Sequence, residues 1–186
     1  MTETQLLPAA ELYVAALPSD QSGLFESLTE AVITTLQPGT AYEAYLAGQI
    51  SELDVEIYRH RQMRNGLLRS QFQDEVIFKL SRFRPATHSY SETIEFRARR
   101  DPKVKRAWKL ARQLCSDDPA IRDDAKHALA KQGHDLNHLT ALAYQNAAGI
   151  ADHEDRIAQL EVRRRRLLRD FREIVDARSV AAEAVN

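Results

Sequence analysis

Two long stretches of the 186-residue chain carry apolar side chains at alternating steps of four and three residues, the spacing of a helix that packs along its length. The stretches span residues 40–80 and 150–180. Because an unbroken stretch of this kind requires a rod of many helical turns, it constrains the fold more than any other feature. The pattern predicts an all-α protein, in which two long helices form an antiparallel hairpin or coiled-coil-like bundle with three or four shorter helices.

The predicted seam consists of apolar positions from both stretches. These are Ile50, Leu53, Ile57 and Leu67 in the first stretch and Ile157, Leu160, Leu167, Phe171 and Ile174 in the second. Polar side chains interrupt it at His60, Arg64, His153, Arg164 and Arg178. Gly66 lies inside the first helix, where glycine costs about 1 kcal/mol, and either bends this helix or admits a close neighbour.

Local signals divide the chain into segments of a single helical domain, residues 1–186. Residues 1–20 contain Pro8 and Pro18 and predict a loosely ordered arm. "SGLFESLTEAVITTL" predicts a helix that ends at Pro38-Gly39, and Thr40 with Glu43 forms a capping box for the first long helix.

The middle of the chain contains a predicted loop and then short helices. Residues 81–101 lack a helical period and contain Pro85, so we expect a loop; a short strand over "SETIEF" would have no partner. Asp101-Pro102 and Asp118-Pro119 are helix-start signals within residues 102–148, where we expect short helices.

Composition and cysteine usage exclude several classes of protein. No apolar run approaches the roughly 20 residues of a membrane span, and the first residues lack a basic region, so we expect neither a membrane protein nor a signal peptide. The single Cys115 has no internal disulfide partner, and its helical context predicts a buried, inert thiol. We therefore expect a cytoplasmic protein.

The net charge of −1 conceals strong segregation along the chain. Residues 1–57 have a net charge of −9 and residues 58–112 of +10, followed by −5 over 113–162 and +3 over 163–186. One interpretation is that acidic and basic blocks attract each other inside the fold. The other is that the basic block is offered to a polyanion.

The densest basic segment is "FRARRDPKVKRAWKLAR", residues 96–112, with eight Lys/Arg, one acidic residue and two aromatic residues, Phe96 and Trp108. Phosphate neutralisation needs such charge density, and an aromatic ring can stack on a base. The candidate nucleic-acid contacts here are Arg97, Arg99, Arg100, Lys103, Lys105, Arg106, Lys109 and Arg112. Docking on the acidic N-terminal helix, or plain solvation, explains the same charges.

A second basic run, "RRRRLLRDF", adds Arg163, Arg165, Arg166 and Arg169 as candidate contacts. The run wraps around nearly a full helical turn, so its members cannot all face one partner. Arg164 falls on the seam, where it either reaches out to solvent or fixes the register.

We find no pattern that indicates catalysis or a metal site. His134 and His138 lie four residues apart, but "HDLNH" lacks the glutamate of a zinc protease site. Neither a glycine-rich phosphate loop nor a nucleophile motif is present. We therefore expect no enzyme activity, no cofactor, no metal and no small-molecule substrate.

The segment "LQPGTAYEAYLAGQISELDVEIYRHRQMRNGLL" resembles a loose family of bacterial helical proteins that are often encoded near mobile elements. Its matching positions are Glu56, Arg59, Arg61, Leu67 and Leu68. "HEDRIAQLEVRRRRLLRDFREI" is similar to the Arg-rich heptad helix at the C-terminus of that family. The resemblance implies a bacterial origin and a helical fold, but no activity, and it does not include the basic segment 96–112.

Two functions agree with these patterns. The first is a non-enzymatic interaction protein that binds a protein partner, or itself as a homodimer, through its helical seams. The second is a weakly specific DNA- or RNA-binding protein that uses residues 97–112 with help from the 163–169 run. An open basic stripe would favour the second, and basic helices buried against acidic ones would favour the first.

Overall fold

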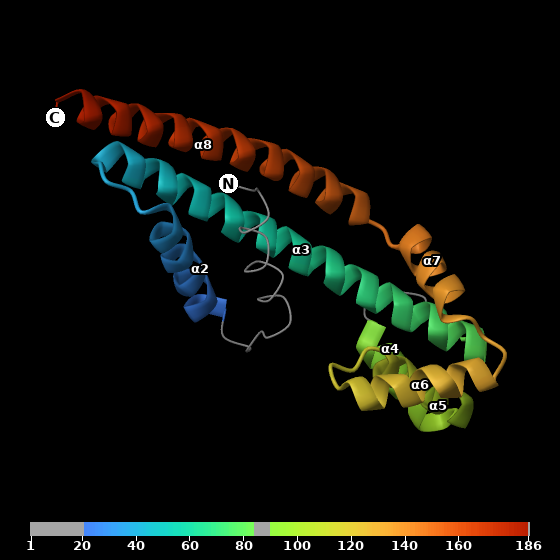
Figure 1. Cartoon of the computed structure of the whole chain (residues 1–186). Helices are drawn as coiled ribbons and strands as arrows, with labels where there is room; N and C mark the ends of the chain where they lie inside the picture. The colour runs from blue at the N-terminus through green and yellow to red at the C-terminus, as the bar shows by residue number, and fades with distance from the viewer. Residues whose placement is uncertain (1–20, 84–89, 186) are drawn as a thin grey trace. The chain divides into compact units, whose positions relative to one another are not determined.

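The structure is a computed structural model that describes residues 21–83 and 90–185; over these residues it contains seven helices and no strand (Figure 1). The helices are α2 (Gln21–Leu36), α3 (Ala41–Ser81), α4 (Tyr90–Arg100), α5 (Pro102–Leu114), α6 (Pro119–Lys131), α7 (Leu136–Asn146) and α8 (Ile150–Val185). The predicted all-α class is confirmed. The predicted arm over residues 1–20 lies outside the described residues.

Three short helices begin with an aspartate whose carboxylate accepts a hydrogen bond from a free backbone amide. Asp101 accepts from the amide of Lys103 at 2.9 Å, and Asp118 accepts from that of Ala120 at 2.9 Å. Asp135 does the same at the start of α7. The helix starts predicted at Asp101-Pro102 and Asp118-Pro119 are therefore confirmed, and a cap of this kind stabilises a helix by about 1 kcal/mol.

The loop predicted for residues 81–101 is wrong over Tyr90–Arg100, which form α4; residues 84–89 lie outside the described residues. "SETIEF" is likewise helical, not a strand. Among the described side chains of this helix, Ile94 and Ala98, one turn apart, are the buried apolar residues. Two such positions form too short a pattern to detect in sequence, and burial of Ile94 in the core overrides the weak local signal.

The chain divides into two compact units, where the sequence predicts a single domain. Unit 1 consists of Met1–Arg59 and Ala158–Asn186, and unit 2 consists of His60–Ile157. Helices α3 and α8 each contribute residues to both units. Each unit has its own core.

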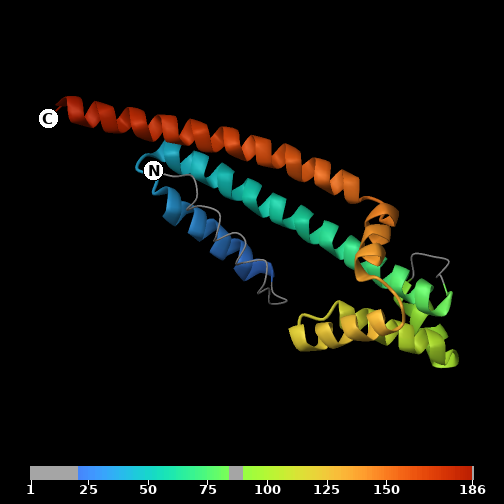
Figure 2. The ribbon, with the colours of Figure 1, turned by 45° about the vertical axis from the view of Figure 1, so that its right-hand side comes forward.

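The core of unit 1 joins α2, the first half of α3 and the later part of α8, and these helices lie side by side in both ribbon views (Figure 2). Its buried residues are Leu46, Ala47, Ile50 and Phe171, and Val32, Leu36, Leu167, Leu168, Ile174 and Val175 pack against them. The apolar residues of the two predicted stretches thus pack on one another in this unit.

Two charged pairs connect α3 with α8 within unit 1. Arg164 donates to the Asp54 carboxylate at 3.1 Å, and Arg178 donates to the Glu43 carboxylate at 2.8 Å. Glu43 also accepts from the backbone amide of Gly39 at 2.6 Å, while its own amide donates to the Thr40 hydroxyl. The predicted capping box is therefore confirmed in its Thr40 half only, because the glutamate accepts from the amide of Gly39 instead of that of Thr40.

The core of unit 2 combines the second half of α3 with α4 to α7. Its buried residues include Val76 and Ile77 of α3, Ile94 of α4, and Leu110 and Leu129 of α5 and α6. On α5 the buried residues are Val104, Ala107, Leu110, Ala111 and Leu114. Because they occupy one side of this helix, its basic residues lie on the opposite side.

Candidate functional site

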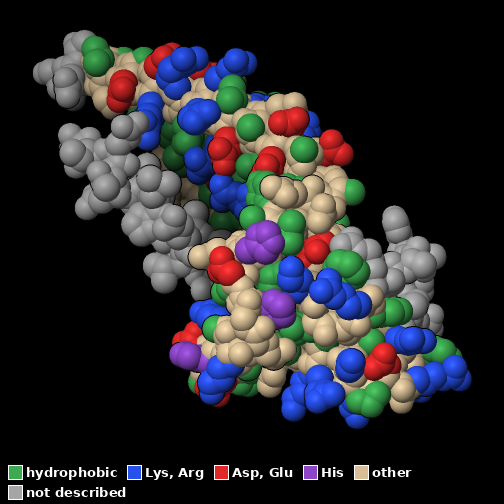
Figure 3. All heavy atoms as spheres, turned by 90° about the vertical axis from the view of Figure 1, so that its right-hand side faces the viewer, with side chains coloured by type: hydrophobic (Ala, Val, Ile, Leu, Met, Phe, Trp, Pro, Cys, Tyr) green, Lys and Arg blue, Asp and Glu red, His purple; other side chains and the backbone are tan. Residues whose placement is uncertain are grey.

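The eight candidate basic residues of α4 and α5 are all solvent-exposed. They are Arg97, Arg99, Arg100, Lys103, Lys105, Arg106, Lys109 and Arg112. Lys and Arg side chains crowd the lower part of the face drawn in Figure 3, where the short helices lie. We name these eight residues the basic face of α4–α5.

Within the described residues, no carboxylate pairs with any member of this basic face. Three of its arginines lie against aromatic rings instead: Arg97 against Phe83 at 5.8 Å, Arg100 against Phe96 at 4.4 Å and Arg112 against Trp108 at 5.2 Å to the ring centroid. A guanidinium in such a contact keeps its charge and most of its donors available to an anion.

An open groove of about 590 Å³ lies beside α5. Its α5 side is formed by Lys105, Trp108, Lys109 and Arg112, and Arg69 and Gln73 of α3 also line it. One carboxylate, that of Asp117, lines the groove as well. Four cations against one carboxylate make the groove electropositive.

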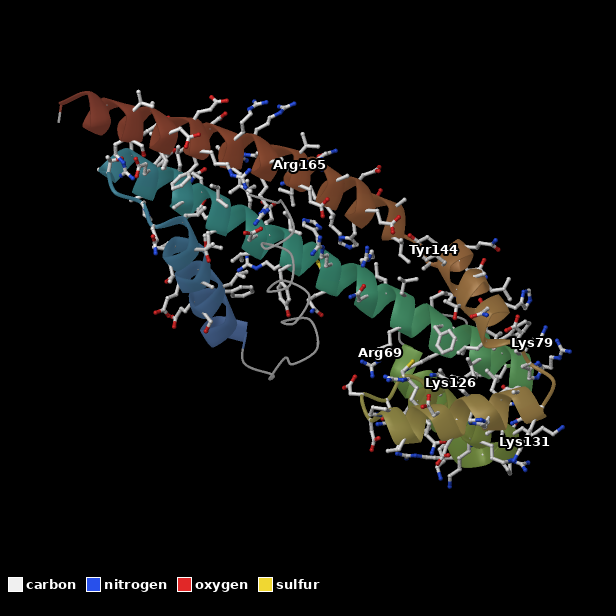
Figure 4. The ribbon with its side chains drawn as sticks, viewed as in Figure 1. Arg69, Lys79, Lys126, Lys131, Tyr144 and Arg165 are labelled. Carbon is white, nitrogen blue, oxygen red and sulfur yellow. The ribbon has the colours of Figure 1, made fainter. Side chains whose placement is uncertain are left out.

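Arg69 is a groove residue that sequence reasoning missed. It projects from α3 on the side where the short helices lie (Figure 4), and its guanidinium donates to the backbone carbonyl of Cys115 at the end of α5. The only sequence signal was its membership of the basic block 58–112. Cys115 itself is half-buried, where we predicted a buried residue.

The second basic run divides as its heptad positions predicted. Arg164 lies on the seam and pairs with Asp54, whose side chain is 17% exposed, so it fixes the register of α8 against α3 within unit 1. Arg163, Arg165, Arg166 and Arg169 are exposed. These four belong to unit 1, whereas the basic face of α4–α5 belongs to unit 2.

Most residues of the predicted interaction seam are covered by the chain itself. Ile50, Leu53, Ile57, Ile157, Leu160 and Phe171 are buried, and Leu167 and Ile174 are half-buried. Leu67 is 38% exposed and is the one seam residue left accessible.

The histidines do not form a metal site among the described residues, where no three His, Cys, Asp or Glu side chains are placed to share an ion. His134 is half-buried and His138 is exposed. His60 and His153, both seam positions, meet with their Nδ1 atoms 3.0 Å apart in unit 2. One ring must donate and the other accept in this contact, which connects α3 with α8 within unit 2.

One ionisable group near this contact has a shifted pKa. The hydroxyl of Tyr144 donates a hydrogen bond to the Glu154 carboxylate, and Arg64 lies 4.0 Å from the same carboxylate. That hydrogen bond, with partial desolvation and the negative charge of Glu154, raises the pKa of Tyr144 above its ordinary value of 10.0. The shift therefore reports a contact between α7 and α8. None of the residues in this contact lines the groove beside α5.

Within the described part of the chain, no helix combines the length and apolarity needed to cross a bilayer. No protein-family model, curated protein or solved structure matches the chain. The groove and the basic face of α4–α5 together form the candidate functional site.

Proposed function

We propose that this protein binds nucleic acid, without catalysing a reaction, through the basic face of α4–α5 and the groove beside α5. The observation that carries this proposal is that all eight basic side chains are exposed and none pairs with a described carboxylate. If these charges served to hold the fold together, the basic side chains would form ion pairs with residues of the acidic blocks. Recognition rests on Lys and Arg side chains that suit phosphates, so we expect weak sequence specificity.

Self-association through the helical seams is the less favoured function. It would require accessible seams, but six of the nine predicted seam residues are buried within the chain. A homodimer would need a different apolar surface. The favoured partner is therefore a nucleic acid. Separately, the half-buried free thiol of Cys115 agrees with the cytoplasmic location that we propose.

The arrangement that we propose for the long helices is an antiparallel hairpin. It is supported within unit 1 by the order of the two charged pairs: Glu43 precedes Asp54 on α3, whereas its partner Arg178 follows Arg164 on α8. Phe171 lies between the two arginines in sequence and packs with Ile50, which lies between the two acids.

The test compares two quadruple variants in a titration of a fluorescently labelled oligonucleotide, followed by anisotropy at about 50 mM salt. The first variant replaces Lys105, Arg106, Lys109 and Arg112 with alanine. The matched control replaces Arg163, Arg165, Arg166 and Arg169, which removes the same charge from exposed positions of unit 1.

We expect the first variant to lose about tenfold or more in affinity, because it removes direct phosphate contacts. The control variant should lose several-fold less affinity, because it weakens only the long-range electrostatic attraction and removes no direct phosphate contact. Equal losses would show that affinity depends on net charge alone. Unchanged binding by the first variant would contradict the assignment of the site.

A further inference from the structure

The groove beside α5 differs from a simple basic surface because an aromatic ring lies among its cations. Trp108 packs against the core of unit 2 with part of its surface and lines the groove with the rest. Core packing holds the indole in one orientation, so the ring is presented as a rigid platform. Lys105, Lys109 and Arg112 surround it on the same helix.

We infer that this groove is a subsite for single-stranded nucleic acid, in which a base stacks on Trp108 while Lys105, Lys109 and Arg112 bind the adjoining phosphates. The inference rests on the proposed function and narrows its ligand. In a duplex the bases are stacked on one another and the phosphates lie on the outside, so no base face is available to stack on the indole ring. In a single strand the base faces are free, and stacking on an aromatic residue adds to phosphate binding.

The size and charge of the groove agree with this occupant. Its volume of about 590 Å³ lies in the range of sites that hold small organic ligands, so it accommodates a nucleobase with its sugar. Arg112, which lies 5.2 Å from the centroid of Trp108, is exposed, so its guanidinium is free to pair with a phosphate when a base takes the ring. Asp117 lines the groove and disfavours a phosphate next to it, so the backbone should follow the basic residues of α5.

A second aromatic residue on the basic segment supports the same ligand. Phe96 of α4 is 57% exposed, although burial of such a side chain normally stabilises a fold, and the guanidinium of Arg100 lies 4.4 Å from its ring centroid. An exposed ring beside a cation repeats the pairing of Trp108 with Arg112. A single strand offers free base faces to such a ring, whereas the bases of a duplex are stacked on one another.

The experiment uses the full chain, in which Trp108 is the only tryptophan, so emission excited at the long-wavelength edge, where the six tyrosines do not absorb, reports on this groove. The probes are short oligothymidine and oligouridine strands and a hairpin duplex of equal phosphate number, at about 50 mM salt. We expect both single strands to quench the emission in a saturable manner. The duplex should bind about tenfold more weakly and leave the emission nearly unchanged.

Two substitutions at this position separate stacking from packing. Trp108→Leu keeps an apolar side chain against the core but removes the ring, and should weaken single-strand binding about 5- to 100-fold while duplex binding changes little. Trp108→Phe restores a ring and should recover part of the affinity. Circular dichroism of each variant checks that it is folded. The quenching experiment on the parent protein tests the inference even if neither variant folds.

The outcomes distinguish this inference from the proposal on which it rests. Duplex binding equal to single-strand binding, or single-strand binding without quenching, would overturn the inference and leave nucleic-acid binding by the basic face intact. Absence of binding to all three probes would overturn both.

Discussion

The carboxyl group of Glu43 shows how unit 1 accommodates a buried acidic side chain. Glu43 has no exposed surface, and its Oε2 atom accepts from the amide of Gly39 and from Arg178. Its other oxygen has no hydrogen-bond partner among the described residues, so the charge depends on these two donors. A Cβ atom at Gly39 would lie too close to the guanidinium of Arg178, so a larger residue there would displace this guanidinium from its present position.

Replacement of Arg178 with alanine should therefore destabilise the protein. We expect the free energy of unfolding to fall by about 1.5–3 kcal/mol, because a buried carboxylate loses its charged donor. Urea unfolding followed by circular dichroism measures the change. The control is Arg172→Ala on the same helix, an exposed residue whose loss should change stability by no more than about 0.5 kcal/mol. Similar values for both variants would contradict the importance of the pair.

Tyr144 offers a test of the hydrogen bond between α7 and α8. Its raised pKa means that the folded state holds the phenolic proton more tightly than the unfolded state. The contribution to stability is therefore complete below pH 10 and is lost as pH rises through the higher pKa of the folded state. The Glu154→Gln variant should shift the pKa of Tyr144 down toward 10.0, because it removes the charged acceptor.

The measurement is the ultraviolet titration of the phenolate, taken as the difference between each protein and the same protein with Tyr144→Phe. This subtraction removes the other five tyrosines. An identical titration with and without the Glu154 carboxylate would show that the hydrogen bond does not persist in solution.

At the scale of the helices, sequence predicts long elements and their starts well. The seven-residue pattern located α3 and α8, and Asp-Pro pairs located α5 and α6, because both signals depend on neighbours within a few turns. Helix α4 was missed because, among its described side chains, Ile94 and Ala98 alone are buried, and burial of Ile94 depends on residues from other helices. Arg69 was missed as a groove residue for the same reason.

Gly66 lies inside α3, at a position where glycine makes this helix less stable than alanine would. The sequence left open whether this glycine bends α3 or admits a close neighbour, and a Cβ atom built on it meets nothing within 4 Å. It therefore admits no close neighbour, and alanine should fit. We expect Gly66→Ala to raise the free energy of unfolding by about 0.5–1 kcal/mol, because alanine favours the helix and restricts the unfolded chain.

The matched control for this prediction is Gly133→Ala after the end of α6. A Cβ atom there also meets nothing within 4 Å, but its φ of +76° disfavours any L side chain, so the same substitution should destabilise the protein. Thermal unfolding of the two variants should thus give shifts of opposite sign. A destabilising Gly66→Ala would indicate that this glycine serves a bend in α3.

At the scale of the whole molecule, the segregation of charge is the feature that connects sequence with function. The excess of Lys and Arg over residues 58–112 was visible in the sequence, but its exposure was not, because internal pairing with acidic blocks explained it equally well. The eight exposed side chains of α4 and α5 favour use of this charge on a partner. Binding to such a partner must then depend on counterion release.

The most direct test of this account is the affinity of the parent protein for a single-stranded oligonucleotide over a salt series from about 50 to 200 mM. If Arg69, Lys105, Lys109 and Arg112 each neutralise a phosphate, log K should fall against log salt with a slope of about −3. A slope near that value would support the basic groove as the binding site. Absence of binding at the lowest salt, or an affinity that salt does not change, would contradict it.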